Sequence, residues 1–265
     1  MTTTIQETVA DSATMVRRNV LHLRRYPSMT LMLVMAPILF LLLFVYVLGD
    51  TLGAGLGTAG TGRSAYLDYV TPGIALIAVT SAAQGTAISV AMDMTEGIVA
   101  RFRTMAIARS ALLTGHVIGS MIQAMICLGA VLGVAVLIGF RPDAGGLGWL
   151  GAVGILALLA FALTWLSVAL GLVSPNVETA SNWPMLLMLL PFTSSAFVPT
   201  DSLPGGLRTF AEAQPFTPVI ETVRSLLAGD GAGGDALAAV AWCLVIAAVS
   251  FVWSMRLFRR EPRST

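Results

Sequence analysis

Runs of about twenty uncharged apolar residues recur along the whole chain, and they constrain its fold more than any other feature. A helix of about 20 such residues crosses the hydrocarbon core of a bilayer. A helix also pairs its own backbone N–H and C=O groups, which lipid cannot do. The sequence therefore predicts an all-α integral membrane protein, a single domain over residues 1–265 with six transmembrane helices. The expected spans are residues 29–49, 70–92, 110–140, 147–173, 183–199 and 236–255.

The charge content excludes several classes of function. Only 11% of the 265 residues are charged, roughly half or less of the usual share in soluble domains, and 15 basic residues nearly balance 14 acidic ones. This balance argues against a nucleic-acid partner, which would require a basic patch. All 15 basic residues are Arg, so the chain lacks the Lys of a phosphate-binding P-loop. Any ATP that drives this protein, with its Mg²⁺, must therefore bind another chain.

Cysteine and histidine do not suggest a metal site or a catalytic site. Cys127 and Cys243 each lie inside an apolar run, where a thiol behaves as a small hydrophobic side chain. The two histidines, His22 and His116, lie far apart in the sequence and have no metal-binding pattern around them. We therefore expect neither a metal nor a cofactor in this chain.

The distribution of Arg predicts which side of the membrane each segment faces, because cytoplasmic loops are enriched in Arg and Lys. With a cytoplasmic N-terminus, 11 of the 15 Arg fall inside and 4 fall outside. We therefore expect a multi-pass protein of the cell membrane with both termini in the cytoplasm. Residues 1–28 carry two Arg pairs seven positions apart and apolar residues at helical spacing. This pattern predicts an amphipathic helix in the headgroup layer, with a solvated N-terminal helix as the alternative.

The loop between the second and third spans, DMTEGIVARFRTMAIAR, contains a short amphipathic pattern. Ile98, Phe102 and Met105 share one face of a helix, and the Arg residues of the loop point elsewhere. An apolar ridge with charged flanks is suited to docking into a groove of a soluble partner. An ordinary cytoplasmic turn would fit the same charge placement.

Residues 200–231, before the last span, are too apolar for a segment that lies freely in water. Pro204, Pro215 and Pro218 divide the segment, and Glu221 and Arg224 can pair at three residues apart along a helix. Irregular backbone at membrane depth must be covered by protein. We therefore expect a re-entrant outer segment that dips into the outer leaflet or caps the bundle, with an ordinary extracellular loop as the alternative.

Together, these two segments resemble a known family. The stretches EGIVARFRTMAIARSALLTG and SSAFVPTDSLPGGLRTFAEAQPFTPVIETVRSLLAG are similar to the ABC type-2 exporter permeases, specifically the daunorubicin-resistance-type group. The resemblance extends over nearly the whole chain in span number, length and orientation. It departs at Ala106, where the family has Pro, which leaves the start and pitch of the loop helix open. The group's N/Q-P-x-T-P-hydrophobic-acidic-x-x-R motif corresponds here to Gln214, Pro215, Thr217, Pro218, Glu221 and Arg224.

The resemblance implies the permease subunit of an ATP-driven exporter for a hydrophobic or amphipathic compound, such as a drug, antibiotic, polyketide or lipid. Such permeases pair as dimers, with a second copy or a paralogous permease, and each binds a separate ATPase chain. The N-terminal helix and the loop helix would couple ATP hydrolysis to the spans, and the re-entrant segment would form an outer gate. The implied coupling residues are Glu96, Ile98, Arg101, Phe102, Arg103, Met105 and Arg109. The implied gate residues are Pro215, Thr217, Pro218, Glu221 and Arg224.

The family also implies that spans two and five line the translocation path. Polar groups at bilayer depth are costly, so they face protein or a cavity. For Gln84 in span two, substrate contact and an interhelical hydrogen bond are equally consistent with the sequence. In span five the candidates either line the path or pack beside Pro191: Phe192, Ser194, Ser195 and Phe197.

The third span contains His116 and two G-x-x-x-G pairs. We expect a structural role for His116 rather than a proton relay, because no Asp or Glu falls inside any expected span. The pairs Gly115/Gly119 and Gly129/Gly133 predict close helix packing, against either the same chain or another protomer.

Two other classes of membrane protein are weaker readings of the sequence. An ion-coupled secondary transporter normally needs carboxylates within its spans, and many are built from repeated halves that this chain lacks. An intramembrane protease needs a Ser-His pair within spans or an H-E-x-x-H motif, and neither pattern is present. A related permease for polysaccharide or cell-envelope lipid export stays open, since the sequence does not reveal the substrate.

Overall fold

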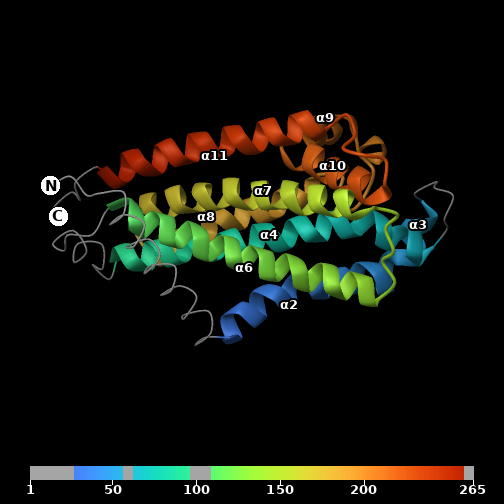
Figure 1. Cartoon of the computed structure of the whole chain (residues 1–265), viewed down its shortest axis with the longest axis horizontal. Coiled ribbons are helices and arrows are strands. Elements are labelled where there is room, and N and C mark those ends of the chain that lie inside the picture. Colours follow the sequence, from blue (N-terminus) through green and yellow to red (C-terminus); the bar gives the residue numbers. More distant parts are fainter. Residues whose placement is uncertain (1–26, 56–61, 96–108, 260–265) are drawn as a thin grey trace.

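The chain folds into a bundle of long helices that run back and forth along one direction (Figure 1). This computed structural model describes residues 27–55, 62–95 and 109–259, where all regular structure is helical. Five helical segments in those ranges are long and apolar enough to cross a membrane. They are Leu31–Ala54, Arg63–Thr95, Leu113–Leu137, Gly146–Val173 and Ala236–Leu257. The prediction of an all-α membrane protein is confirmed, whereas these ranges hold no sixth helix of membrane-spanning length.

Helix α4 (Arg63–Thr95) lies at the centre of the bundle and is buried along most of its length. The long helices that pack against it are α2 (Pro27–Leu43), α6 (Arg109–Leu137), α7 (Gly146–Val173) and α8 (Val177–Leu189). Small residues permit close contact, since a Cβ on Gly171 of α7 would lie 2.7 Å from the carbonyl oxygen of Ala87. Between helices in lipid, such close packing is a main source of attraction.

The expected boundaries of the spans differ from the observed ones mainly at the first two helices. Helix α2 continues through a π-helical turn, η1 (Phe44–Leu48), into α3 (Gly49–Ala54), beyond the expected end at residue 49. Helix α4 begins seven residues before the expected start at residue 70 and continues past residue 92 to Thr95. The expected spans at 147–173 and 236–255 match α7 and α11 (Ala236–Arg259) within a few residues.

Residues 183–199, the fifth expected span, form no continuous helix, and the interruption falls at Pro191. Helix α8 starts earlier, where the Asn176 side chain caps it by accepting a hydrogen bond of 2.8 Å from the Thr179 N–H. The α-helix ends at Leu189 and is followed by a 3₁₀ turn, η2 (Leu190–Thr193), and by non-helical chain. Pro191 accounts for this break, because proline has no N–H and its ring clashes with the preceding helical turn.

The segment at 200–231 folds back onto one end of the bundle as short helices rather than as irregular chain. A 3₁₀ turn, η3 (Thr200–Ser202), leads to α9 (Gly205–Ala213) and α10 (Phe216–Ala228). Helix α10 contacts α4, α7 and α11 (Figure 1). Its Val219, Val223 and Leu227 side chains are buried. A Cβ on Gly148 of α7 would lie 2.6 Å from the Leu226 carbonyl oxygen, so glycine permits this approach. We call this side of the bundle the α10 end.

The outside of the bundle is apolar, as expected for a protein surrounded by lipid. Large apolar side chains such as Met32 on α2, Leu186 on α8 and Leu244 on α11 are exposed. A surface of this kind is typical of contact with lipid or with another subunit rather than with water. A Cβ at Gly129 or Gly133 would meet no atom within 4 Å, so this G-x-x-x-G pair does not pack within the described part of the chain.

Candidate functional site

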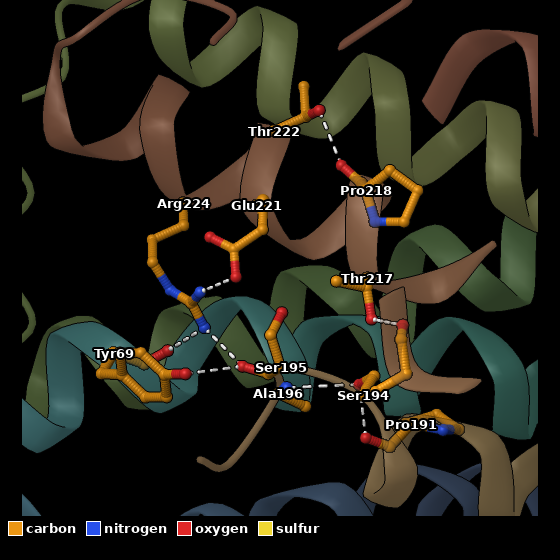
Figure 2. Close-up of polar contacts among 11 residues, drawn as sticks. Tyr69, Pro191, Ser194, Ser195, Ala196, Thr217, Pro218, Glu221, Thr222 and Arg224 are labelled. Atoms are coloured by element: carbon orange, nitrogen blue, oxygen red, sulfur yellow. Dashed lines mark hydrogen bonds and ion pairs between the residues drawn. The ribbon is translucent and has the colours of Figure 1, made fainter. Parts of the chain in front are cut away.

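Arg224 of α10 connects the outer segment to the rest of the bundle (Figure 2). Its Nη2 donates to the carbonyl oxygens of Ser195 at 2.8 Å and Tyr69 at 3.2 Å, and its Nη1 donates to Glu221 Oε1 at 2.6 Å. The guanidinium also lies 3.9 Å from the centroid of the Tyr69 ring. Only 19% of the Arg224 side chain is exposed, which strengthens these charge-assisted contacts. We call this set of contacts the Arg224 anchor.

Two tyrosines of α4 hold the non-helical chain that follows η2. The Tyr69 hydroxyl donates to the Ser195 carbonyl oxygen at 2.9 Å, and the Tyr66 hydroxyl donates to that of Phe197 at 3.3 Å. Non-helical chain leaves such carbonyls without backbone partners, and buried carbonyls need donors from elsewhere. Helix α4 approaches closely here, because a Cβ on Gly73 would lie 2.6 Å from Ala196 Cβ. Helix α4 therefore supplies the hydrogen-bond donors that this non-helical chain requires. We call η2 and the chain that follows it, residues 190–199, the interrupted segment.

The junction between α9 and α10 brings the remaining expected gate residues together. Thr217 Oγ1 donates to the Ala211 carbonyl oxygen at 2.5 Å, which links the two helices. Gln214 Nε2 donates to the Thr193 carbonyl oxygen at 2.8 Å, which links the junction to η2. Pro215 is the N-cap of α10 and Pro218 lies in its first turn, where a missing N–H costs no helical hydrogen bond. The five expected gate residues thus lie on one element, and Glu221 pairs with Arg224 as their spacing predicts.

The charges of α9 are paired within the outer segment. Arg208 donates to Glu212 Oε1 at 2.7 Å and lies 2.7 Å from Asp201 Oδ1. The hydrogen bond to Glu212 and the charge of Asp201 raise the pKa of Arg208 above its usual value. The neighbouring Leu207 and Phe210 are exposed, so α9 presents a surface of paired charges and apolar side chains.

Four phenylalanines form a cluster between α2, η1 and the interrupted segment. Phe44 stacks on Phe197 at 4.4 Å between ring centroids, and Phe197 stacks on Phe192 at 4.9 Å. Phe40 meets the Phe192 ring edge-on at 5.8 Å. Phe197 is buried, whereas Phe192 is 40% exposed. We call these residues the aromatic cluster; it runs from the core to the surface of the protomer.

The other expected path residues are engaged in contacts within the chain. Ser194 Oγ donates to the Pro191 carbonyl oxygen at 2.5 Å and accepts from the Ala196 N–H at 3.2 Å, so it stabilises the turn after η2. Ser195 is buried beside it. Gln84 Nε2 donates to the Ser181 carbonyl oxygen at 3.3 Å, from α4 to α8. Of the two readings of Gln84, the interhelical hydrogen bond is the one that the structure contains.

A buried pair of titratable side chains lies at the opposite end of the bundle from α10. Asp93 of α4 and His116 of α6 meet at 2.9 Å between Oδ2 and Nε2, and their side chains are 9% and 5% exposed. At this distance the imidazole ring and the carboxyl group share a hydrogen bond. Asp93 belongs to helix α4, one residue past the expected end of the second span at residue 92. The hydropathy of the sequence placed the end of the span at residue 92. Ser89 and Asp93 lie on one face of a helix, and this spacing could have indicated that the helix continues.

The expected coupling residues, apart from Arg109, lie outside the residues that the structure describes. Residues 1–26 and 96–108 are not among the described ranges, and Arg109 is the first residue of α6 with no described side-chain position. The coupling roles stay predictions for these residues: Glu96, Ile98, Arg101, Phe102, Arg103, Met105 and Arg109. Among the described residues, no group of three or more His, Cys, Asp or Glu side chains is placed to hold a metal ion.

Comparison with known proteins gives consistent matches over most of the chain. The model of the ABC-2 type transporter family matches residues 12–228. The daunorubicin resistance ABC transporter permease protein DrrB1 of Streptomyces coeruleorubidus is 28% identical over 254 residues, which cover 96% of this chain and 87% of that protein. The probable doxorubicin resistance ABC transporter permease protein DrrC of Mycobacterium tuberculosis is 24% identical over 219 residues, which cover 83% of this chain and 77% of that protein.

Proposed function

Because the chain belongs to the ABC-2 type transporter family, we propose that it is the permease subunit of an exporter that moves a hydrophobic or amphipathic compound out of the cytoplasm. The names of its relatives refer to daunorubicin and doxorubicin resistance, which supports a drug, antibiotic, polyketide or lipid as the substrate. The observation that carries the proposal is the Arg224 anchor. An outer gate needs a folded cover that is attached to the helices of the path, and Arg224 attaches α10 to α4 and to the interrupted segment.

In this proposal ATP and Mg²⁺ bind a separate ATPase subunit. The absence of Lys, and thus of a P-loop, supports this division of labour. The N-terminal helix at 1–28 and the loop helix at 96–109 contact that subunit on the cytoplasmic side. Both termini lie on that side, since 11 of the 15 Arg residues then face the cytoplasm. The α10 end consequently faces outward.

The hydrogen bonding around Arg224 suits a gate that opens. Arg224 Nε, Ser195 Oγ and Gln214 Oε1 are buried, and each lacks a hydrogen-bond partner among the described residues. A buried polar atom without a partner raises the free energy of the state that contains it. Opening the outer segment would expose these atoms to water. The closed state therefore gives up part of its stability, which lowers the work that ATP must supply for opening.

The translocation path is proposed to run beside α4 and the interrupted segment. The aromatic cluster reaches the protomer surface at Phe192, and the outer faces of α2 and α8 expose apolar side chains. A second copy, or a paralogous permease, would cover these faces and enclose a path between the two subunits. Exposed aromatic rings favour apolar and planar substrates through stacking.

Ion-coupled secondary transport is the rival function, and one observation favours it. Asp93 is a buried carboxyl group within α4, whereas the expected spans contain no Asp or Glu. Membership of the ABC-2 family weighs against that rival, because the family name describes ATP-binding-cassette transporters. Export of polysaccharide or cell-envelope lipid is the alternative within the family.

Reconstitution tests the proposed function. The chain is co-expressed with its candidate ATPase subunit, purified as a complex and reconstituted into liposomes. Daunorubicin and a fluorescent phospholipid serve as probes. We expect ATP-dependent transport of at least one probe and stimulation of ATP hydrolysis by that probe. The matched control replaces the P-loop Lys of the ATPase subunit and should abolish both. Transport driven by a proton or sodium gradient without the ATPase would instead establish the rival function.

A further inference from the structure

The Asp93–His116 pair connects two helices close to the point where the chain passes from one to the other. Asp93 lies two residues before the end of α4 at Thr95, and His116 lies two helical turns after the start of α6 at Arg109. Residues 96–108, which join these helices, form the proposed coupling loop. Any movement of that loop is therefore transmitted first to the two helix ends that the pair holds together.

The chemistry of the pair makes it a rigid connection. Both side chains are almost fully buried, and the Oδ2–Nε2 distance of 2.9 Å fixes their relative position. The other ring nitrogen of His116, Nδ1, lies 3.5 Å from Ser89 Oγ, which helps to orient the ring. Apolar contacts between helices allow sliding, whereas a hydrogen bond is directional. Separation of the helices would break this buried polar contact, at a cost in free energy that opposes the separation.

A second polar contact, deeper in the bundle, joins the same helices without a charged side chain. The hydroxyls of Thr86 on α4 and Ser120 on α6 are hydrogen bonded, and Ser120 Oγ lies 3.4 Å from Thr164 Oγ1 on α7. Buried polar contacts are therefore repeated along the α4–α6 interface. The hydroxyl contact offers a matched control, because its removal weakens the same interface and leaves Asp93 and His116 in place.

We infer that Asp93 and His116 are positioning residues for energy coupling, because they lock the adjoining ends of α4 and α6 into one unit. The inference rests on the proposed function, in which a partner ATPase moves the loop at 96–108. With the lock in place, that movement displaces α4 and α6 together. Without the lock, the two helix ends separate and the movement no longer reaches the outer part of α4, where Tyr66 and Tyr69 hold the interrupted segment.

Spin labels can measure this lock directly. Cys127 and Cys243 are replaced by Ala, and labelled Cys residues are placed at exposed positions on α4, α6 and α11. The pair Met92→Cys and Ile118→Cys reports the α4–α6 distance, and the pair Met92→Cys and Val252→Cys reports the distance from α4 to α11. The doubly labelled chain is diluted with unlabelled chain. Pulsed electron paramagnetic resonance then measures the distance between the two labels within one protomer. The complex with its ATPase is measured without nucleotide and with trapped ATP.

The pair is then altered in three ways. His116→Ala removes the hydrogen-bonding ring, His116→Gln retains an amide group that can form a hydrogen bond, and Asp93→His combined with His116→Asp exchanges the partners. We expect the nucleotide-free α4–α6 distance distribution to broaden about twofold in His116→Ala, to stay narrow in His116→Gln, and to narrow again in the exchanged variant. Thr86→Val should leave it narrow. With trapped ATP, the unaltered complex should change its α4–α11 distance at constant α4–α6 distance, and His116→Ala should lose this behaviour.

Each result bears on the inference in a defined way. An unchanged α4–α6 distribution in a folded His116→Ala variant would overturn it. If His116→Ala does not accumulate in the membrane, the exchanged variant decides, and a folded exchanged variant with a broad distribution would overturn it. Failure of all three pair variants to accumulate, with normal Thr86→Val, would assign the pair to folding alone. If trapped ATP changes no distance in the unaltered complex, the proposed function fails, while the nucleotide-free distances still judge the lock.

Discussion

Arg224 contacts several groups besides Glu221, and we therefore expect substitutions of Arg224 to have larger effects than substitutions of Glu221. Glu221 is 35% exposed, so solvent screens much of its contribution. Arg224 also binds two carbonyl oxygens and the Tyr69 ring. Arg224→Ala would remove a charge-assisted donor from both carbonyls and the contact with the Tyr69 ring, although the Tyr69 hydroxyl would still donate to the Ser195 carbonyl. Glu221→Ala leaves these other contacts in place.

We therefore expect Arg224→Ala to reduce ATP-dependent export by more than tenfold and Glu221→Ala to reduce it several times less. Arg224→Lys should resemble Arg224→Ala, because an ammonium group cannot bind two carbonyls in a fixed fork and stack on a ring. Exchange of the two residues should not restore transport, since an Arg at position 221 starts almost one helical turn earlier. Transport by equal amounts of reconstituted complex provides the measurement. Full activity of Arg224→Ala would show that the anchor is not part of the gate.

Local spacing in the sequence predicted the Glu221–Arg224 pair but not its other partners. The i,i+3 rule applies within one helix. The hydrogen bonds of Arg224 to Tyr69 and Ser195 join residues 155 and 29 positions apart, and no local pattern encodes such a contact. The Asp93–His116 pair was not predicted, for a different reason. A hydropathy window ends a span at the first acidic or basic residue, even when the helix continues and buries that residue.

At the scale of elements, the rate of thiol labelling should vary with helical periodicity along the outer segment. Single Cys residues are introduced from Leu207 to Leu227, in a background without Cys127 and Cys243. An impermeant thiol reagent applied from outside should react slowly at buried positions such as Val219, Val223 and Leu227. It should react quickly along exposed α9, for example at Leu207, and a Cys at exposed Ala232 serves as the reference. Trapped ATP on the partner should raise the rates at the buried positions if the segment opens. Uniform fast labelling in both states would mean a loop rather than a gate.

The loop helix offers a second prediction at this scale. Phe102→Asp places a carboxylate on the apolar ridge formed with Ile98 and Met105, and burial of an unpaired charge against a partner costs several kcal/mol. We expect the variant to insert into the membrane normally but to lose association with the ATPase, as measured by co-purification. Thr104→Asp adds the same charge on another face of the helix and should associate normally. Normal binding and export by Phe102→Asp would refute the docking role.

The sequence predicted the existence of the elements more reliably than their ends. The helices α7 and α11 matched closely because long uncharged runs fix both of their ends. The break after Leu189 was visible only as Pro191, and a proline alone does not tell whether a helix kinks or ends. The two helices of the outer segment were expected as a re-entrant stretch. The close packing of α10 on α7 requires Gly148, and no sequence pattern reveals its contact with Leu226.

For the whole molecule, the division of labour between this chain and its partner gives a simple prediction. Purified alone in nanodiscs, the chain should hydrolyse ATP no faster than a mock preparation, because it has no Lys with which to form a P-loop. Phosphate release measured over a range of ATP concentrations tests this directly. Addition of the ATPase subunit to the same sample is the positive control. Turnover by the lone chain that survives further purification would contradict the proposed function.

Composition was sufficient to predict the surroundings of the molecule, and motifs were needed for its family. The share of charged residues predicted a protein solvated by lipid, and the apolar exterior of the bundle agrees. The outer-segment motif and the coupling loop indicated the ABC-2 permeases, which the family match over residues 12–228 confirms. The substrate and any second permease subunit were beyond such reasoning, because residue patterns within one chain do not reveal the surfaces that would bind them.

The Arg224 anchor also bears on how such a protein can change over evolutionary time. Arg224 and the two tyrosines of α4 hold the interrupted segment through the carbonyl oxygens of residues 195 and 197, which every amino acid possesses. The side chains at those positions are not the groups being held. A substitution at an exposed position of the same segment, such as Phe192, therefore leaves these backbone attachments in place. The segment can vary at its surface over generations without loss of the contacts that hold it.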